Sequence, residues 1–213
     1  MKKINLIIIF FSILLNNFIF LNLQSQINNS IVVKVGQYLI TSIDVQNEII
    51  TNLLINQQEI TQENINDNKN YALKNLINKS IKRSEINKYE IKDYNEKDLQ
   101  NYIKRISETL NTDRKGLKNL FDQNNIDYEA FIEKHRLELI WNTLIFQLYA
   151  NQTNVNIVDV NNEIEKIKEN KSTEELKKIK QSILNEKKEK KLNLFSRSHF
   201  SKLENTINVN FNE

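Results

Sequence analysis

Apolar side chains recur at helical spacing through residues 127–150 (DYEAFIEKHRLELIWNTLIFQLYA), which contain neither Gly nor Pro. The spacing predicts one long helix, because residues about 100° apart fall on repeating faces. One face carries Leu137, Ile140, Trp141, Leu144 and Leu148. The roughly opposite face carries Tyr128, Phe131, Leu139, Phe146 and Tyr149, with Ile132 beside them. A helix that is apolar on two sides is either sandwiched between neighbours or offers one side to a partner. We expect the first face to be core, Trp141 included, and both interpretations of the second face stay open.

The pattern changes to short alternating runs within residues 31–43, which predicts two strands about a turn at Gly36 and Gln37. Gly36 supplies the positive φ that such a turn requires. Thr41 precedes Asp44 by three positions, which is a capping-box spacing and predicts a helix over residues 42–57. Its inner face would carry Val45, Ile49 and Leu53.

Polar residues 58–69 predict a loop, and helical spacing resumes over residues 71–89. Asn95 is placed to cap the next helix, residues 112–113 begin a short one, and Asp127 caps the long one. Ser172 and Glu175 form a second capping box, which begins a Lys-rich helix. The alternation over residues 207–211 predicts a final strand that pairs with the strands near Val33, because a two-stranded hairpin alone is marginal.

The composition favours long helices, since the chain has two Gly and no Pro in 213 residues. The absence of Cys excludes disulfides and sulfur-ligated zinc. A net charge of +3 gives no indication of nucleic-acid binding. Neither His135 nor His199 has a second ligand at metal spacing, and no glycine-built oxyanion hole accompanies the serines near His199. The charges of residues 163–191 alternate in sign, which is typical of a solvated helix face.

Residues 1–25 combine Lys2 and Lys3, an apolar run and a polar end, which is the pattern of a secretory signal cleaved after Ser25. The alternative is an uncleaved anchor, because residues 4–23 are about long enough to span a bilayer. Asn16 and Asn17 in the middle of the run favour the cleaved signal.

Several stretches occur in a suggestive order: the paired strands, the ITxxD helix start, NKSIKRSEINKYEI, LNTDRKGLKNLFDQNNIDYEAFIEKHR and NIVDVNNEI. Together they resemble the N-terminal chaperone region of the SurA family, periplasmic proteins that escort outer-membrane β-barrels. The resemblance covers about residues 31–164. It implies one or two parvulin prolyl-isomerase domains after a segment such as residues 156–168. Such domains are Gly-rich with paired His residues, whereas no Gly follows Gly116 here and only His199 remains.

We therefore expect a mainly α fold, a multi-helix SurA-like chaperone core with a small β-sheet formed by N-terminal and C-terminal strands. Residues 1–25 would be the signal peptide, residues 26–171 the chaperone region, and residues 172–213 a helix and strand that complete the same core. No domain that could carry enzymatic activity is recognised.

The resemblance implies a periplasmic holdase chaperone that binds unfolded outer-membrane proteins without prolyl-isomerase activity. Two alternatives remain: a peptidyl-prolyl cis-trans isomerase by family membership, and an envelope interaction module anchored in the inner membrane. No cofactor, metal, nucleic acid or small-molecule ligand is expected. For client contact we name the second face of the long helix: Tyr128, Phe131, Leu139, Phe146 and Tyr149.

Overall fold

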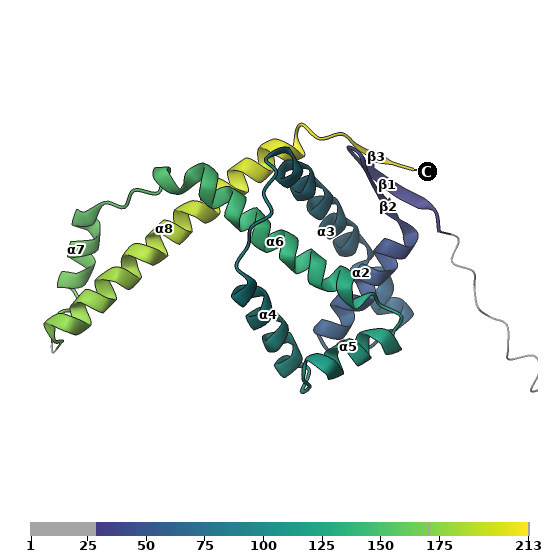
Figure 1. Ribbon diagram of the computed structural model, residues 1–213, viewed down its shortest axis with the longest axis horizontal. Helices are drawn as coiled ribbons and strands as arrows, with labels where there is room; N and C mark the ends of the chain where they lie inside the picture. The colour runs from purple at the N-terminus through teal and green to yellow at the C-terminus, as the bar shows by residue number, and fades with distance from the viewer. Residues whose placement is uncertain (1–28, 170, 213) are drawn as a thin grey trace, which may run out of the picture.

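The computed structural model describes residues 29–169 and 171–212, which form a mainly helical fold with one small antiparallel sheet (Figure 1). The expected fold class is confirmed. The N-terminal elements are β1 (Ile31–Val35), β2 (Tyr38–Thr41), α2 (Ser42–Ile55), α3 (Gln62–Lys88), α4 (Glu96–Thr109) and α5 (Arg114–Gln123). The C-terminal elements are α6 (Tyr128–Tyr149), the 3₁₀ turn η1 (Ala150–Gln152), α7 (Ile157–Glu165), α8 (Thr173–Glu204) and β3 (Val209–Phe211). The expected signal segment, residues 1–25, lies outside the described residues.

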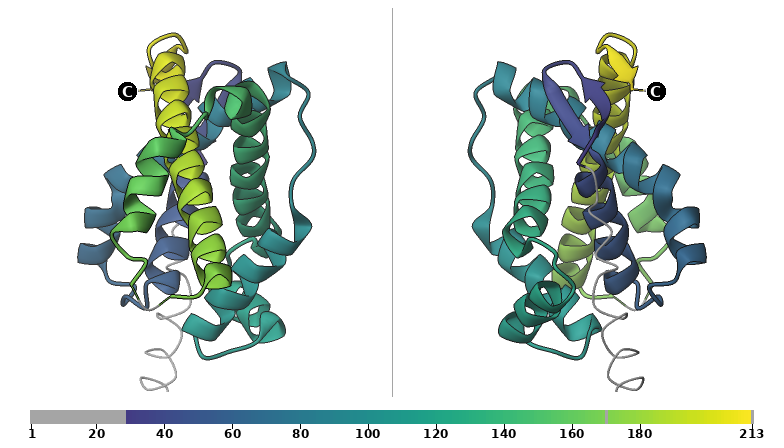
Figure 2. Two further views of the ribbon diagram at one scale, coloured as in Figure 1. Left: turned by 90° about the vertical axis from the view of Figure 1, so that its left-hand side faces the viewer. Right: turned by 90° about the vertical axis from the view of Figure 1, so that its right-hand side faces the viewer.

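The sheet joins the two ends of the described chain, in the order β2-β1-β3. Gly36 has φ +54° at the first turn position between β1 and β2, which is where a type II′ hairpin turn requires glycine. On the other side of β1, Val33 pairs with Phe211 and Val35 with Val209. The right-hand view of Figure 2 shows β3 beside the hairpin. The expected third strand is therefore confirmed.

Local capping signals fix most helix starts. The Thr41 hydroxyl accepts from the Asp44 amide while the Asp44 carboxylate accepts from the Thr41 amide, and Ser172 and Glu175 repeat this reciprocal arrangement. Asn95, Asp113 and Asp127 cap α4, α5 and α6. These side chains satisfy amide groups that have no partner inside the helix, which is why the sequence signals for them are reliable.

The helix that was expected over residues 71–89 begins earlier than the apolar spacing indicates. It starts at Gln62, where the Thr61 hydroxyl accepts from the Asn64 amide. The first turns of α3 are polar and largely exposed, so they carry no apolar periodicity. The expectation of a loop up to residue 69 is therefore wrong from Gln62 onward.

The buried side chains form three clusters, and α6 contributes to two of them. The first cluster joins the sheet to α2 and α3. The second joins α4 and α5 to the start of α6, and the third joins the rest of α6 to Ile86 and the end of α8. Trp141 is only 2% exposed, as expected for a core residue. Because α6 is covered on two sides, most of its length is a sandwiched helix.

An arm extends from this compact body. It consists of α7 packed against the first part of α8, and Figure 1 shows both projecting away from α4 and α5. Lys187 pairs with Glu163, and Lys180 donates to Asn161, so polar contacts tie the two helices together. None of the 32 described residues of α8 is buried. No helix within the described ranges is long and apolar enough to cross a membrane.

Candidate functional site

The side chains named for client contact do not form one exposed surface. Tyr128 and Phe131 are each only 5% exposed. Phe131 lies 4.9 Å from Phe121 between ring centroids, and Tyr128 meets the same ring edge-on at 5.9 Å. At Tyr128 and Phe131 the second face of α6 is therefore buried, which is the sandwiched alternative. The physical reason is that α5 folds back over the start of α6, which periodicity within α6 cannot indicate.

The remaining side chains of that face differ from one another. Leu139 is partly buried beside the second cluster. The Tyr149 ring stacks on Phe195 of α8, with centroids 5.0 Å apart and planes at 4°. Only Phe146 is open to solvent, with 58% of its surface exposed. Client contact by any of these side chains remains a prediction, and Phe146 is the one whose position suits it.

Phe146 lies next to an open groove between α6 and α8 with a volume of about 340 Å³. The groove is lined by Asn142, Ile145, Glu189, Leu192, Asn193 and Ser196. Phe146 follows Asn142 by four positions and so extends the same face of α6. We call this region the α6–α8 groove. Leu194 of α8 is 64% exposed but lies on a different face of that helix from the lining residues Leu192 and Ser196.

Further apolar side chains lie in solvent along the arm. Ile157 is 49% exposed, Val158 62% and Ile167 39%. They stand in or next to α7, which packs along α8. The sequence alone does not indicate that these positions are exposed, because no periodic signal within one helix reveals which apolar residues a neighbour leaves uncovered.

A polar junction fixes α8 to the body just beyond the groove. His199 Nδ1 lies 2.7 Å from the Tyr149 hydroxyl, and His199 Nε2 lies 3.0 Å from Glu85 Oε1. A neutral imidazole protonated at Nε2 fits both contacts, since it donates to Glu85 and accepts from Tyr149. Burial raises the pKa of Tyr149. Trp141 Nε1 donates to Ser196 Oγ at 2.9 Å. These groups hold three helices together, and Ser196 is already engaged.

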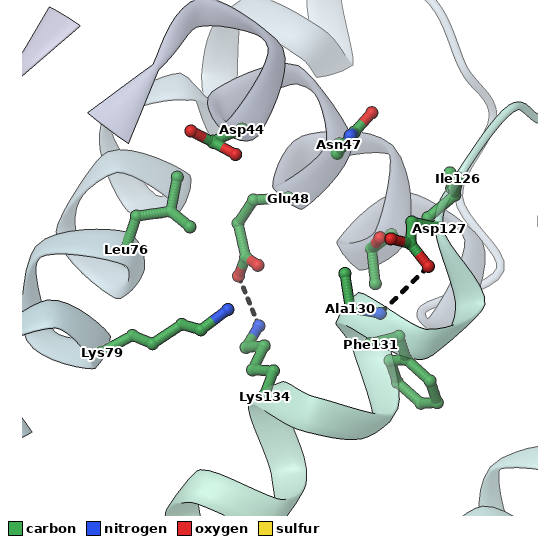
Figure 3. A pocket seen from close by; sticks show the side chains of 11 residues that line it. Asp44, Asn47, Glu48, Leu76, Lys79, Ile126, Asp127, Ala130, Phe131 and Lys134 are labelled. Atoms are coloured by element: carbon green, nitrogen blue, oxygen red, sulfur yellow. Dashed lines mark hydrogen bonds and ion pairs between the residues drawn. The ribbon is translucent and has the colours of Figure 1, made fainter. Parts of the chain in front are cut away.

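A second polar cluster lies deeper, among α2, α3 and α6. Figure 3 shows Glu48, Lys79 and Lys134 pointing toward one another from these helices. Glu48 is only 6% exposed, and its Oε1 accepts from Lys134 and from the Asn75 amide. Burial, followed by the charge of Arg83, lowers the pKa of Lys79. The surrounding pocket is about 80 Å³, so the cluster is an internal ion pair with a second ammonium beside it.

The histidines give no sign of a metal centre. His199 is engaged as above, and the His135 ring stacks on Tyr102 with centroids 3.5 Å apart. Burial lowers the pKa of His135. Across residues 29–169 and 171–212, no group of His, Cys, Asp and Glu is placed to hold a metal ion.

No protein-family model matches the chain, and no curated protein matches it. Among solved structures, a match belongs to a pair described as "two structurally related SurA-like chaperones", the virulence factor PEB4 and the periplasmic protein Cj1289 of Campylobacter jejuni. That match is 16% identical, has a TM-score of 0.43, and covers 87% of this chain and 100% of that chain. A likeness at this level carries no argument about function.

Proposed function

We propose that the protein is an exported holdase chaperone that binds unfolded polypeptide at the α6–α8 groove and along the adjoining arm. One observation carries the proposal: Phe146 stands in solvent one turn after Asn142, which lines a shallow open groove, and α7 and α8 carry further exposed apolar side chains. Phe146, Val158 and Leu194 are each more than half exposed. Exposed apolar side chains at a groove are typical of surfaces that receive a partner.

The groove suits polypeptide because it combines apolar and polar groups in an open depression. Leu192 offers partly exposed apolar surface, whereas Asn142 and Asn193 offer amide donors and acceptors to a client backbone. Shallow contact of this kind gives modest and promiscuous affinity, which a carrier needs in order to release its client. Binding alone requires no cofactor.

Export and the class of client are the finer parts of the proposal. Lys2 and Lys3 followed by an apolar run support export through a secretory signal. The order of motifs that resembles the SurA family supports a periplasmic location and clients that are unfolded outer-membrane β-barrel proteins. The same resemblance, together with the absence of a recognisable parvulin sequence, supports chaperoning without isomerase activity.

The test is whether the purified protein suppresses aggregation of a urea-unfolded β-barrel protein after dilution, followed by light scattering. Phe146→Ser should weaken suppression, and Gln147→Ser, an exposed neighbour on the same helix, should not. Equal suppression by both variants would remove the groove from the proposal. Absence of suppression by the unmodified protein would contradict the chaperone function itself.

A separate assay addresses the isomerase alternative. A short peptide with an X-Pro bond exchanges slowly between cis and trans, over tens to hundreds of seconds. We expect no acceleration by the purified protein. Acceleration at catalytic concentrations would make the isomerase the better description.

A further inference from the structure

The strand β3 forms one edge of the sheet, and its backbone amide and carbonyl groups point alternately toward β1 and away from it. Gly36 N donates to Asn208 O at 2.9 Å, and Asn212 N donates to Val32 O at 3.0 Å. Asn210 pairs with Lys34 between these two contacts. Residues 208, 210 and 212 therefore direct their backbone groups toward β1. Because the direction alternates along an antiparallel strand, Val209 and Phe211 direct theirs away from the sheet.

This outer edge is open. The amide and carbonyl groups of Val209 and Phe211 have no hydrogen-bond partner among the described residues. The Phe211 side chain is 62% exposed. Residues 205–212 contain no charged residue and no Pro, which are two of the features that block strand pairing at an edge.

The opposite edge of the sheet differs. In β2, Ser42 N donates to Ser30 O, so Thr41 directs its backbone outward. The Thr41 amide donates instead to the Asp44 carboxylate at 2.8 Å, as part of the α2 capping box. The chain then turns directly into α2. The capping box thus blocks the β2 edge at this end, whereas the β3 edge remains free along its described length.

We propose that the outer edge of β3 binds an extended segment of an unfolded polypeptide as a fourth strand. The proposal rests on the proposed function for its class of partner. The outward amide and carbonyl groups of Val209 and Phe211 are complementary to an extended backbone of any sequence. Phe211 would lie beside apolar side chains of the added strand, so the edge favours segments in which apolar and polar residues alternate, as in a β-barrel strand.

A second copy of this chain is the other conceivable occupant, and the size of the edge argues against it. A stable dimer usually buries about 1,200–2,000 Å². The edge strand spans 3 residues, which provides only a small part of such an interface. A weak and reversible contact is sufficient for a client that is also held at the α6–α8 groove, since two linked contacts reinforce each other.

The experiment uses proline substitutions to distinguish backbone amides that point away from the sheet from those that point toward β1. Val209→Pro removes an outward amide and leaves the β1 ladder intact, whereas Asn210→Pro removes an inward amide and should destabilise the sheet. Fluorescence anisotropy would measure binding of a labelled peptide in which Val and Thr alternate. We expect Val209→Pro to keep the unfolding transition and to bind roughly two- to tenfold more weakly, as loss of one backbone hydrogen bond implies.

A second probe does not depend on the variant. The same peptide with alternate amides N-methylated cannot complete a ladder, and we expect the unmodified protein to bind it more weakly. Equal binding of both peptides, or unchanged binding by folded Val209→Pro, would overturn strand addition. So would a concentration-dependent dimer that Val209→Pro abolishes, because the edge would then pair two copies.

Failure of strand addition can be distinguished from failure of the chaperone function. If the protein suppresses aggregation and Val209→Pro binds the peptide as well as the unmodified chain, strand addition fails and the chaperone function stands. If the protein does not suppress aggregation, the chaperone function fails. The peptide comparison then still decides whether the edge accepts a strand.

Discussion

His199 of α8 and Glu85 of α3 lie 114 positions apart in the sequence, yet His199 Nε2 lies 3.0 Å from Glu85 Oε1. The Glu85 side chain is buried and that of His199 is mostly covered, with 6% and 13% of their surfaces exposed. Lys88 approaches the same carboxylate only to 3.6 Å. Among the described residues the imidazole is therefore the nearest side-chain partner of the Glu85 carboxylate, and it links the helix that forms the arm to the body.

We expect His199→Phe to destabilise the protein by about 1–3 kcal/mol, because it leaves the buried Glu85 carboxylate, and the partly buried Tyr149 hydroxyl, without this partner. Urea unfolding monitored by Trp141, the single Trp of the chain, would measure the change at the junction itself. The loss of stability caused by His199→Phe should be smaller when Glu85 has already been replaced by Met, because the effects of substitutions at two interacting residues are not additive. Additive effects of the two substitutions would contradict the coupling.

Replacement of each of the two lysines beside Glu48 should have a different effect on the free energy of unfolding. Lys134→Met removes the ammonium that bonds to Glu48 and should cost about 1–3 kcal/mol, because the carboxylate is buried. Lys79→Met should be neutral or stabilising, because burial lowers the pKa of Lys79 and so opposes its charged form. Chemical denaturation at neutral pH measures the change in the free energy of unfolding for each variant. A larger loss for Lys79→Met would contradict this assignment.

Removal of residues 206–213 should destabilise the body by about 2–4 kcal/mol. It deletes β3 and exposes buried side chains of the first cluster, against which Ile207 and Val209 pack. Thermal unfolding followed by circular dichroism measures the loss. Asn210→Ser is the control, since that side chain is exposed and the ladder is retained. An unchanged transition after the deletion would show that β3 contributes nothing to the core.

The two sides of α6 provide a matched test of stability against client binding. Leu144 is fully buried, so Leu144→Ala should cost about 2–5 kcal/mol. Phe146 is mostly exposed, so Phe146→Ser should change stability by about 0.5 kcal/mol or less. Denaturant unfolding and the aggregation assay, performed on both, separate the roles. A Phe146→Ser variant that unfolds as readily as Leu144→Ala would remove Phe146 from the proposed client surface.

Local signals in the sequence were sufficient for much of the secondary structure. Thr41 with Asp44 and Ser172 with Glu175 act within one helical turn, so their spacing alone predicts where α2 and α8 begin. Gly36 specified the hairpin turn for the same reason. The start of α3 escaped this approach because its cap, Thr61, is followed by polar residues without apolar periodicity.

Tertiary structure decided what each apolar face contacts. The sequence by itself determined that α6 is apolar on two sides, but not that α5 buries Tyr128 and Phe131 while Phe146 remains in solvent. Helical periodicity determines which side chains share a face. Whether that face is buried depends on segments from elsewhere in the chain that pack against it. For the same reason the contacts of Glu85 with His199 and of Glu48 with Lys134 carry no sequence signal. These pairs, and the open edge of β3, exist only because the fold brings distant residues together.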